Sequence, residues 1–95
     1  MRHHRYWTYI LTNYSRSVYY VGVTNNLERR LQEHRGGHVT FTGRYNVHLL
    51  MYAEETKYIL NAIAREKQLK RWSRAEKLAL VRTVNPLFED LSAHM

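Results

Sequence analysis

Basic side chains stand on a helix face that should point into the protein. The stretch TNNLERRLQEH, residues 24–34, places Leu27, Arg30, Leu31 and His34 three or four positions apart, so they share one face of a helix. The two leucines suit a core, whereas an arginine and a histidine there need a reason. An arginine whose stem lies along the core while its charge reaches water would explain Arg30 without any function.

Glu66 breaks the pattern of a later predicted helix in the same way. It lies in line with Ile59 and Ala62, where that helix should meet the core. Burial of a lone carboxylate is costly unless the group is paired or coordinates a metal. At the edge of this face, Glu66 would instead pair with Arg65, Lys70 or an arginine of a strand.

Together, Arg30, His34 and Glu66 predict one polar site at an edge of the core, which would hold a cation, an anion or both. Asp90 is the only aspartate of the chain, and a site with two metal ions needs several carboxylates. If the site uses a metal, we therefore expect one ion, held by one carboxylate and several waters.

The composition limits the class of protein. The chain has 95 residues, of which 44% are hydrophobic, so we expect one folded domain over 1–95. The formal net charge of +7 favours a polyanionic partner, most often nucleic acid, through counterion release. No apolar run approaches the ~20 residues that span a bilayer, and no signal peptide is recognisable. The absence of cysteine excludes disulfides and fits a cytoplasmic protein.

A β-hairpin is predicted at the start of the chain. Residues 6–12 and 18–23 are rich in aromatic and β-branched types and flank the polar loop NYSRS. Tyr9 and Tyr20 in these strands are packing residues by default. Gly22 in the second strand indicates a close approach of backbone or ligand, or a bulge.

The first helix should begin right after this hairpin. Its cap should be Thr24 or Asn25, because Asn25 and Glu28 have the spacing of a capping box. Gly36-Gly37 should end the helix. The polar, basic stretch 38–46 then predicts a loop.

A third strand and two more helices follow. The mostly apolar stretch 47–54 predicts the strand, and Thr56 should cap a helix over 57–72. Ser73 and Glu76 form an S-x-x-E capping box, which begins another helix.

Pro86 limits the last long helix. Because proline cannot continue a helix, this one should end near Asn85, and a short helix around 87–91 is compatible with the pattern. The order ββαβαα, with that optional last helix, predicts an α+β domain in which helices flank a small sheet.

These motifs together resemble the GIY-YIG nuclease domain, in particular its small stand-alone bacterial members of the UPF0213 type, which are related to the N-terminal nuclease domain of the excision-repair protein UvrC. Thr8-Tyr9-Ile10 stands where the family has GIY, and Tyr20-Val21-Gly22 where it has YIG. The stretches TNNLERRLQEH, AREKQLKRWSRAEKLAL and NPLFEDL are also similar, so the resemblance covers about 7–91. It implies a GIY-YIG fold, with a three-stranded antiparallel sheet flanked by helices.

The resemblance also implies roles for individual residues. Tyr9 would lie next to the attacking water as general base or relay, and Tyr20 would position water or phosphate. Gly22 would let the backbone approach the site. Arg30 would bind the scissile phosphate and stabilise the transition state, and His34 is a second candidate for proton transfer.

The resemblance also implies one metal ligand, and the sequence departs from the family pattern at two places. Glu66 would hold one Mg²⁺ or Mn²⁺ ion, and Asn85 corresponds to a late polar residue near the site. The GIY triplet is altered at Thr8 and Ile10, and Val23 stands where the repair-protein relatives have a lysine. Because Val23 replaces that lysine, the site has one cation fewer.

The activity that the resemblance implies is metal-dependent hydrolysis of DNA phosphodiester bonds by an endonuclease that selects DNA structure, such as branches or nicks, in repair or recombination. A protein partner could supply targeting. The alternatives are a DNA-binding module that is non-catalytic or needs a partner to cut, and a protein-interaction domain. Further basic residues would contact DNA phosphates, although each alone is a solvated helix residue by default: Arg44, Lys57, Arg65, Lys67, Lys70, Arg71, Arg74 and Lys77.

Overall fold

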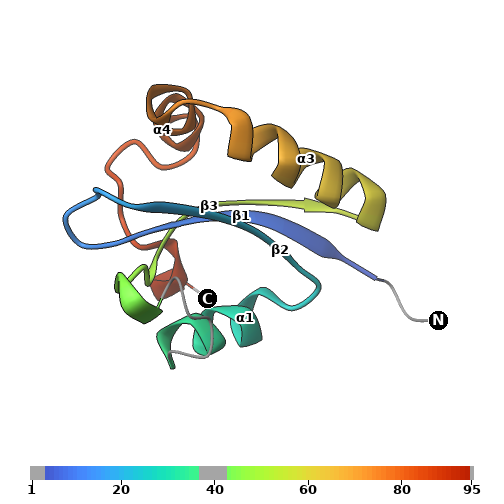
Figure 1. The fold of residues 1–95 in the computed structure, drawn as a ribbon. Helices are drawn as coiled ribbons and strands as arrows, with labels where there is room; N and C mark the ends of the chain where they lie inside the picture. Colours follow the sequence, from blue (N-terminus) through green and yellow to red (C-terminus); the bar gives the residue numbers. More distant parts are fainter. Residues whose placement is uncertain (1–3, 37–42, 95) are drawn as a thin grey trace.

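Three strands form an antiparallel sheet at the centre of the molecule (Figure 1). The computed structural model describes residues 4–36 and 43–94, and within them the strand order is β2-β1-β3. The strands are β1 (Tyr6–Thr12), β2 (Tyr19–Thr24) and β3 (Leu49–Thr56). The α+β prediction with a three-stranded antiparallel sheet is therefore confirmed.

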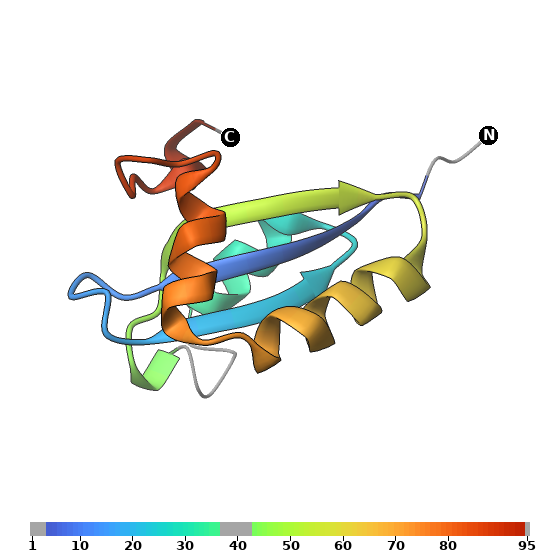
Figure 2. The ribbon, with the colours of Figure 1, turned by 90° about the horizontal axis from the view of Figure 1, so that it is seen from above.

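Helices cover both faces of this sheet (Figures 1 and 2). Helix α1 (Leu27–Arg35) lies on one face, whereas α3 (Ile59–Arg71) and α4 (Arg74–Arg82) lie on the other. A short 3-10 helix, η1 (Leu91–His94), follows near the C-terminus. Figure 2 shows α3 running beside the β2 edge of the sheet, which brings its middle close to the strand that carries Gly22. None of the helices in the described ranges is long and apolar enough to cross a membrane.

Alternation along the strands gives each face its own core. Toward α3 and α4, Ile10, Val21 and Met51 pack with apolar residues of the two helices. The second cluster, toward α1, consists of Tyr9, Leu11, Leu31, Val47 and Leu50. Tyr9 thus occupies a core position in the central strand, and its polar end must find partners inside the protein.

The first helix begins one residue later than the sequence predicts. Asn26, not Asn25, is the cap, and its side chain accepts a hydrogen bond from the backbone N–H of Arg29. The predicted capping box of Asn25 with Glu28 is wrong. The cause is Thr24, which ends β2 and whose hydroxyl accepts a hydrogen bond from the backbone N–H of Asn26 at 3.1 Å. This turn moves the helix start by one position.

The third strand is also displaced from its predicted bounds. It ends at Thr56 rather than at Glu54, because Thr56 pairs with Tyr6 of β1 and extends the ladder. Thr56 therefore caps no helix. Helix α3 begins at Ile59 with Tyr58 as its cap, and no side chain completes that cap.

Asn85 stabilises the turn that follows α4. Its amide nitrogen donates to the carbonyl of Met51 in β3 and to that of Glu89, and its amide oxygen accepts from the N–H of Glu89. The capping box of Ser73 with Glu76 is confirmed, but α4 ends at Arg82.

The short helix that the pattern allowed around 87–91 does not form there, because Phe88 adopts a left-handed φ of 54° and the side chain of Asn85 binds the backbone of Glu89. The C-cap of α1 is Gly36. Of the predicted loop 38–46, residues 38–42 lie outside the described residues, as does Gly37.

Asp90 attaches the C-terminal segment to the rest of the fold. One carboxylate oxygen accepts from the N–H of Leu50 at 3.0 Å and from the hydroxyl of Ser92 at 2.7 Å. The other lies 3.5 Å from the guanidinium of Arg35, at the end of α1. Burial opposes ionisation, but these hydrogen bonds and Arg35 hold the pKa of the Asp90 carboxyl below its ordinary value.

We predict that Asn85→Ala destabilises the protein by about 2–3 kcal/mol, because it leaves the buried carbonyl of Met51 and the N–H of Glu89 without their partner. Urea unfolding measures this change. Asn61→Ala is the control, since Asn61 is exposed on α3 and alanine favours a helix, so its effect should be small. Equal losses in both variants would contradict the assignment.

Candidate active site

The hairpin register places two tyrosines and a glycine on the face toward α1. Tyr9 of β1 pairs with Gly22 of β2, and Leu11 pairs with Tyr20, so their side chains share that face. The ring centroids of Tyr9 and Tyr20 are 6.3 Å apart. Tyr9 is completely buried, while Tyr20 is half-buried.

Gly22 is required because of Tyr9. A Cβ at position 22 would lie 2.5 Å from Cζ and from Oη of Tyr9, and 3.0 Å from Cε1 of Tyr20. Real Cβ atoms do not approach other atoms so closely, so any side chain there would displace the buried ring. The close approach that the sequence indicates is therefore that of the Tyr9 ring to the backbone of β2.

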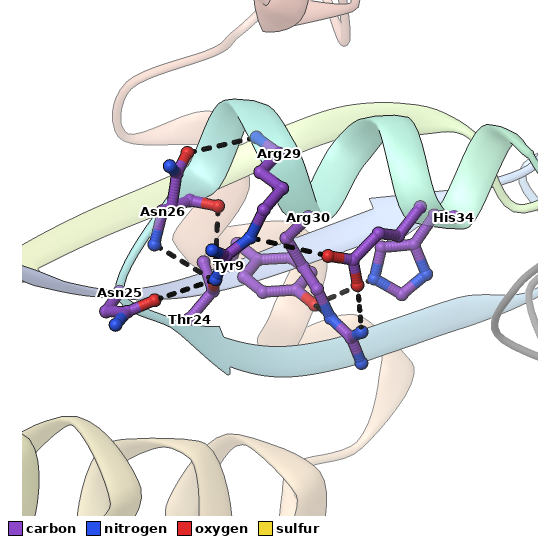
Figure 3. Close-up of polar contacts among 8 residues, drawn as sticks. Tyr9, Thr24, Asn25, Asn26, Arg29, Arg30 and His34 are labelled. Carbon is purple, nitrogen blue, oxygen red and sulfur yellow. Dashed lines mark hydrogen bonds and ion pairs between the residues drawn. The ribbon is translucent and has the colours of Figure 1, made fainter.

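Helix α1 supplies Arg30 and His34 to the hydroxyl of Tyr9 (Figure 3). The hydroxyl lies 2.8 Å from Nε2 of His34 and accepts a hydrogen bond from Nε of Arg30 at 3.4 Å. The His34 ring meets the rings of Tyr9 and Tyr20 edge-on, with centroids 5.7 and 5.1 Å away. The helix face that the sequence marks as both apolar and basic thus lies against the sheet, where Leu31 fills the core between these polar groups.

Burial decides the charge states of the Tyr9–His34 pair. It raises the pKa of Tyr9 to about 12 and lowers the pKa of His34 to about 4. At neutral pH the phenol therefore keeps its proton and the imidazole is neutral. Because Arg30 donates to the phenol oxygen, the phenol can donate its proton to Nε2 of His34, which gives a direct path for proton transfer between the two.

Arg30 remains charged and reaches the surface. Its side chain is 31% exposed, and Nη1 donates to Glu33 at 2.8 Å. Burial opposes the charge, but hydrogen bonds with Tyr9, Glu33 and Tyr20 raise the pKa of Arg30. A cleft of about 360 Å³ opens beside it, between α1, the end of β2 and the start of α3. Tyr6, Asn25 and Arg29 also line this cleft.

Glu66 belongs to α3, which lies on the face of the sheet opposite the helix that carries Arg30 and His34. Its carboxylate pairs with Lys70 at 3.3 Å, one turn along α3. Its negative charge adds to the raised pKa of Tyr9, but burial is the main cause of that shift. Of the predicted trio, Arg30 and His34 meet at the Tyr9 hydroxyl, whereas the ion pair of Glu66 lies within α3.

Other predicted residues have structural partners. The hydrogen bonds of Asn85 go to β3 and the C-terminal turn, so its role at the site stays a prediction. Arg65 is half-buried, pairs with Glu54 at 2.9 Å and stacks on Trp72, and its contact with DNA stays a prediction. Lys77 is half-buried. Six predicted phosphate contacts are exposed: Arg44, Lys57, Lys67, Lys70, Arg71 and Arg74.

Sequence reasoning missed two members of the cleft, Arg29 and Glu33. The guanidinium of Arg29 donates to the side chain of Asn25 at 3.2 Å and lies 3.4 Å from the carboxylate of Glu33 (Figure 3 shows Asn25, Arg29 and Arg30). The signal was present in the sequence, because Glu33 follows Arg29 by four residues and Arg30 by three, the spacings at which helix side chains meet.

Comparison with known proteins now defines the class. The model of the GIY-YIG catalytic domain matches residues 5–79, and the chain belongs to this family. Within it, the chain is similar to UPF0213 proteins. It is 37% identical over 78 residues to the UPF0213 protein of Syntrophus aciditrophicus (strain SB), which covers 80% of this chain and 88% of that one.

A solved structure supports the fold. The solution NMR structure of a UPF0213 protein from Bacillus halodurans matches with a TM-score of 0.56 and 24% identity. The match covers 93% of this chain and 94% of that chain. At this identity the likeness shows the fold alone, and it agrees with the sheet and helices described above.

We predict that Gly22→Ala destabilises the protein by about 1–3 kcal/mol, because the new methyl group collides with the buried Tyr9 ring. Gly36→Ala is the matched control. Gly36 has a φ of −78°, which alanine adopts readily, so that change should be neutral or stabilising by about 0.4–1 kcal/mol. Urea unfolding of both variants measures the difference, and a tolerated Gly22→Ala would contradict the packing.

The buried imidazole predicts a pH dependence of stability. The pKa of His34 is about 4 in the folded protein and 6.5 as its ordinary value, so the unfolded chain binds the proton first. Its stabilising contribution is complete above pH 6.5 and is lost as the pH falls toward 4. Between about pH 7 and about pH 4.5 this loss is about 2–3 kcal/mol.

The measurement is urea unfolding of the wild type and of His34→Gln at both pH values. Glutamine stays neutral, so the variant should lose less stability on acidification than the wild type. The same loss in both proteins would show that other groups cause the pH dependence.

Proposed function

We propose that this chain is a metal-dependent DNA endonuclease, in agreement with its membership of a nuclease family. The observation that carries the proposal is the hydrogen-bonded cluster of Arg30, Tyr9 and His34 beside an open cleft. A fixed cation next to a phenol–imidazole pair combines the two groups that phosphodiester hydrolysis needs: one that stabilises charge on the phosphate and one that accepts a proton.

Arg30 binds the scissile phosphate in this mechanism. Its side chain reaches the cleft while its Nε stays hydrogen-bonded to Tyr9. The guanidinium therefore faces the phosphate on one side and the proton-accepting pair on the other. It stabilises the charge that develops on the phosphoryl oxygens, and it is already in place before the substrate arrives.

Tyr9 and His34 accept the proton of the attacking water. A phenol with a pKa of about 12 is a poor base by itself. It can take a proton from water if it passes its own to Nε2 of His34, 2.8 Å away. Since Tyr9 is completely buried in the free protein, substrate binding has to move the half-buried Tyr20 outward before water reaches the hydroxyl, while Arg30 keeps its bond to Tyr9.

Glu66 is the proposed ligand of one Mg²⁺ or Mn²⁺ ion. The described residues contain no cluster of three or more His, Asp or Glu side chains that could enclose a metal. A partly exposed carboxylate fits Mg²⁺, which often takes one or two carboxylates and completes its shell with water and substrate phosphates. When bound, such an ion would stabilise negative charge on phosphate oxygens and lower the pKa of water.

The proposed substrate is DNA, recognised through its backbone and its shape. The net charge of +7 and the exposed lysines and arginines of α3 and the neighbouring loops support phosphate contacts. Selection of branched or nicked DNA, and a role in repair or recombination with a targeting partner, belong to this proposal as well. A cytoplasmic location follows from such a role.

We predict that the wild type cuts supercoiled plasmid or branched DNA with Mg²⁺ or Mn²⁺ and not with chelator. Glu66→Gln should reduce cutting to the level seen with chelator, because it removes the metal ligand. Glu55→Gln is the control, since that exposed carboxylate pairs with Arg5 and should leave cutting unchanged.

Other outcomes would overturn parts of the proposal. Binding without cutting, unchanged in Glu66→Gln, would mean that the fold serves as a DNA-binding module or needs a partner. Cutting that survives in Glu66→Gln would contradict the metal ligand or reveal a contaminating nuclease, which Arg30→Ala distinguishes because it removes the proposed phosphate contact.

A further inference from the structure

A single carboxylate holds both arginines of the cleft. One oxygen of Glu33 accepts from Nη1 of Arg30 at 2.8 Å, and the other lies 3.4 Å from Nε of Arg29. All three side chains line the same cleft. The hydrogen bond from Arg30 lowers the pKa of the Glu33 carboxyl, so the group is ionised at neutral pH.

This arrangement matches the way in which proteins bind a phosphodiester. Carboxylates and phosphates both present two acceptor oxygens to guanidinium groups, and arginine recognises either in the same geometry. Glu33 offers its two oxygens to two different arginines, as the two non-bridging oxygens of a phosphate would. The carboxylate is also partly exposed, with 35% of its side chain accessible, so it can leave.

When a phosphate binds, only Nη1 of Arg30 would have to exchange its hydrogen-bond partner. Its Nε is bonded to Tyr9, whereas its Nη1 is bonded to Glu33. An incoming phosphate can therefore replace Glu33 while the contact with Tyr9 stays. Arg29 would be released at the same time, although its bond to Asn25 still holds it at the cleft.

We propose that Glu33 is a built-in substitute for a DNA phosphate, which occupies Arg29 and Arg30 in the free protein and which the substrate must displace. The inference rests on the proposed function, because it assumes that these arginines bind DNA phosphate. Its consequence is selectivity: isolated anions and weakly held DNA compete poorly with a carboxylate that is tethered to the same helix, whereas a correctly seated substrate displaces it.

A purely structural role predicts the opposite effect. If Glu33 only holds the arginines in position, its removal should weaken DNA binding, because the arginines would lose their orientation. If it competes with phosphate, its removal should strengthen binding, because the phosphate no longer has to displace the carboxylate from the two arginines. The sign of the change in affinity therefore separates the two roles.

The experiment measures binding of a fluorescein-labelled nicked duplex in chelator, where no cutting occurs, across a series of salt concentrations. It compares the wild type, Glu33→Gln and Glu28→Gln. Glu28 is the matched control, because it is exposed on the first turn of α1 and its substitution changes the net charge equally.

We expect Glu33→Gln to bind about fivefold more tightly than Glu28→Gln. The slope of log K against log salt should equal that of Glu28→Gln, because the bound phosphate reaches the same two arginines in both variants. Affinity equal to that of Glu28→Gln, or weaker, would overturn the inference.

A parallel cutting assay with Mg²⁺ separates this inference from the proposed function. Cutting by the wild type, together with no gain in Glu33→Gln, would refute the carboxylate substitute and keep the endonuclease. Tighter binding by Glu33→Gln without any cutting would support the carboxylate substitute and contradict the endonuclease. If neither the wild type nor Glu33→Gln binds DNA, both fail.

Discussion

The hydroxyl of Tyr9 is buried in the middle of the sheet, and three residues of the candidate site are arranged around this ring. A tyrosine in the middle of the central strand must bury a polar group, and leaving it unsatisfied costs about 1–3 kcal/mol. His34 and Arg30 supply its partners from α1, and Gly22 supplies the room for its ring from β2. The residues of the proposed chemistry are thus also residues that the packing needs.

This coincidence has a consequence for interpreting mutations. Replacement of His34 or Gly22 alters both the stability of the core and the proposed proton path, so loss of activity alone does not identify a catalytic role. Arg30 and Glu66 are partly exposed and can be tested more cleanly. Glu66 is the more informative of the two, because its ion pair with Lys70 does not involve the Tyr9 hydroxyl.

Much of the fold could be predicted from local sequence. The hairpin follows from two runs of strand-forming residues, and the start of α4 follows from the Ser73–Glu76 capping box, which is a purely local signal. The errors lie where tertiary contacts decide. Thr56 would suit a cap, but it pairs with Tyr6 of β1 instead. A helix over 87–91 would be compatible with the local pattern, but the buried side chain of Asn85 binds the backbone there.

The candidate site was predictable to a similar extent. Helical spacing alone brings Arg30 and His34 to one face, whereas their shared partner Tyr9 came from the family resemblance, because sequence spacing does not tell which strand lies beneath a helix. Glu66 shows where prediction of the site from sequence ends. Its spacing indicates a half-buried position, yet pairing with Lys70 and a contribution of its charge to the pKa of Tyr9 are both compatible with the same pattern.

The contacts of Asp90 join the C-terminal segment to β3 and to the helix that carries Arg30 and His34. The family match ends at residue 79, yet Asp90 connects Leu50 of β3 with Arg35, the residue that follows His34 on α1. The last turn of the site helix is therefore held by the tail of the chain. A shortened version that stops at residue 79 would keep Tyr9, Arg30 and His34 but would lose the end of α4, the hydrogen bonds of Asn85 and the contacts of Asp90. Chimeric proteins built from this chain should accordingly keep the residues at least through Ser92.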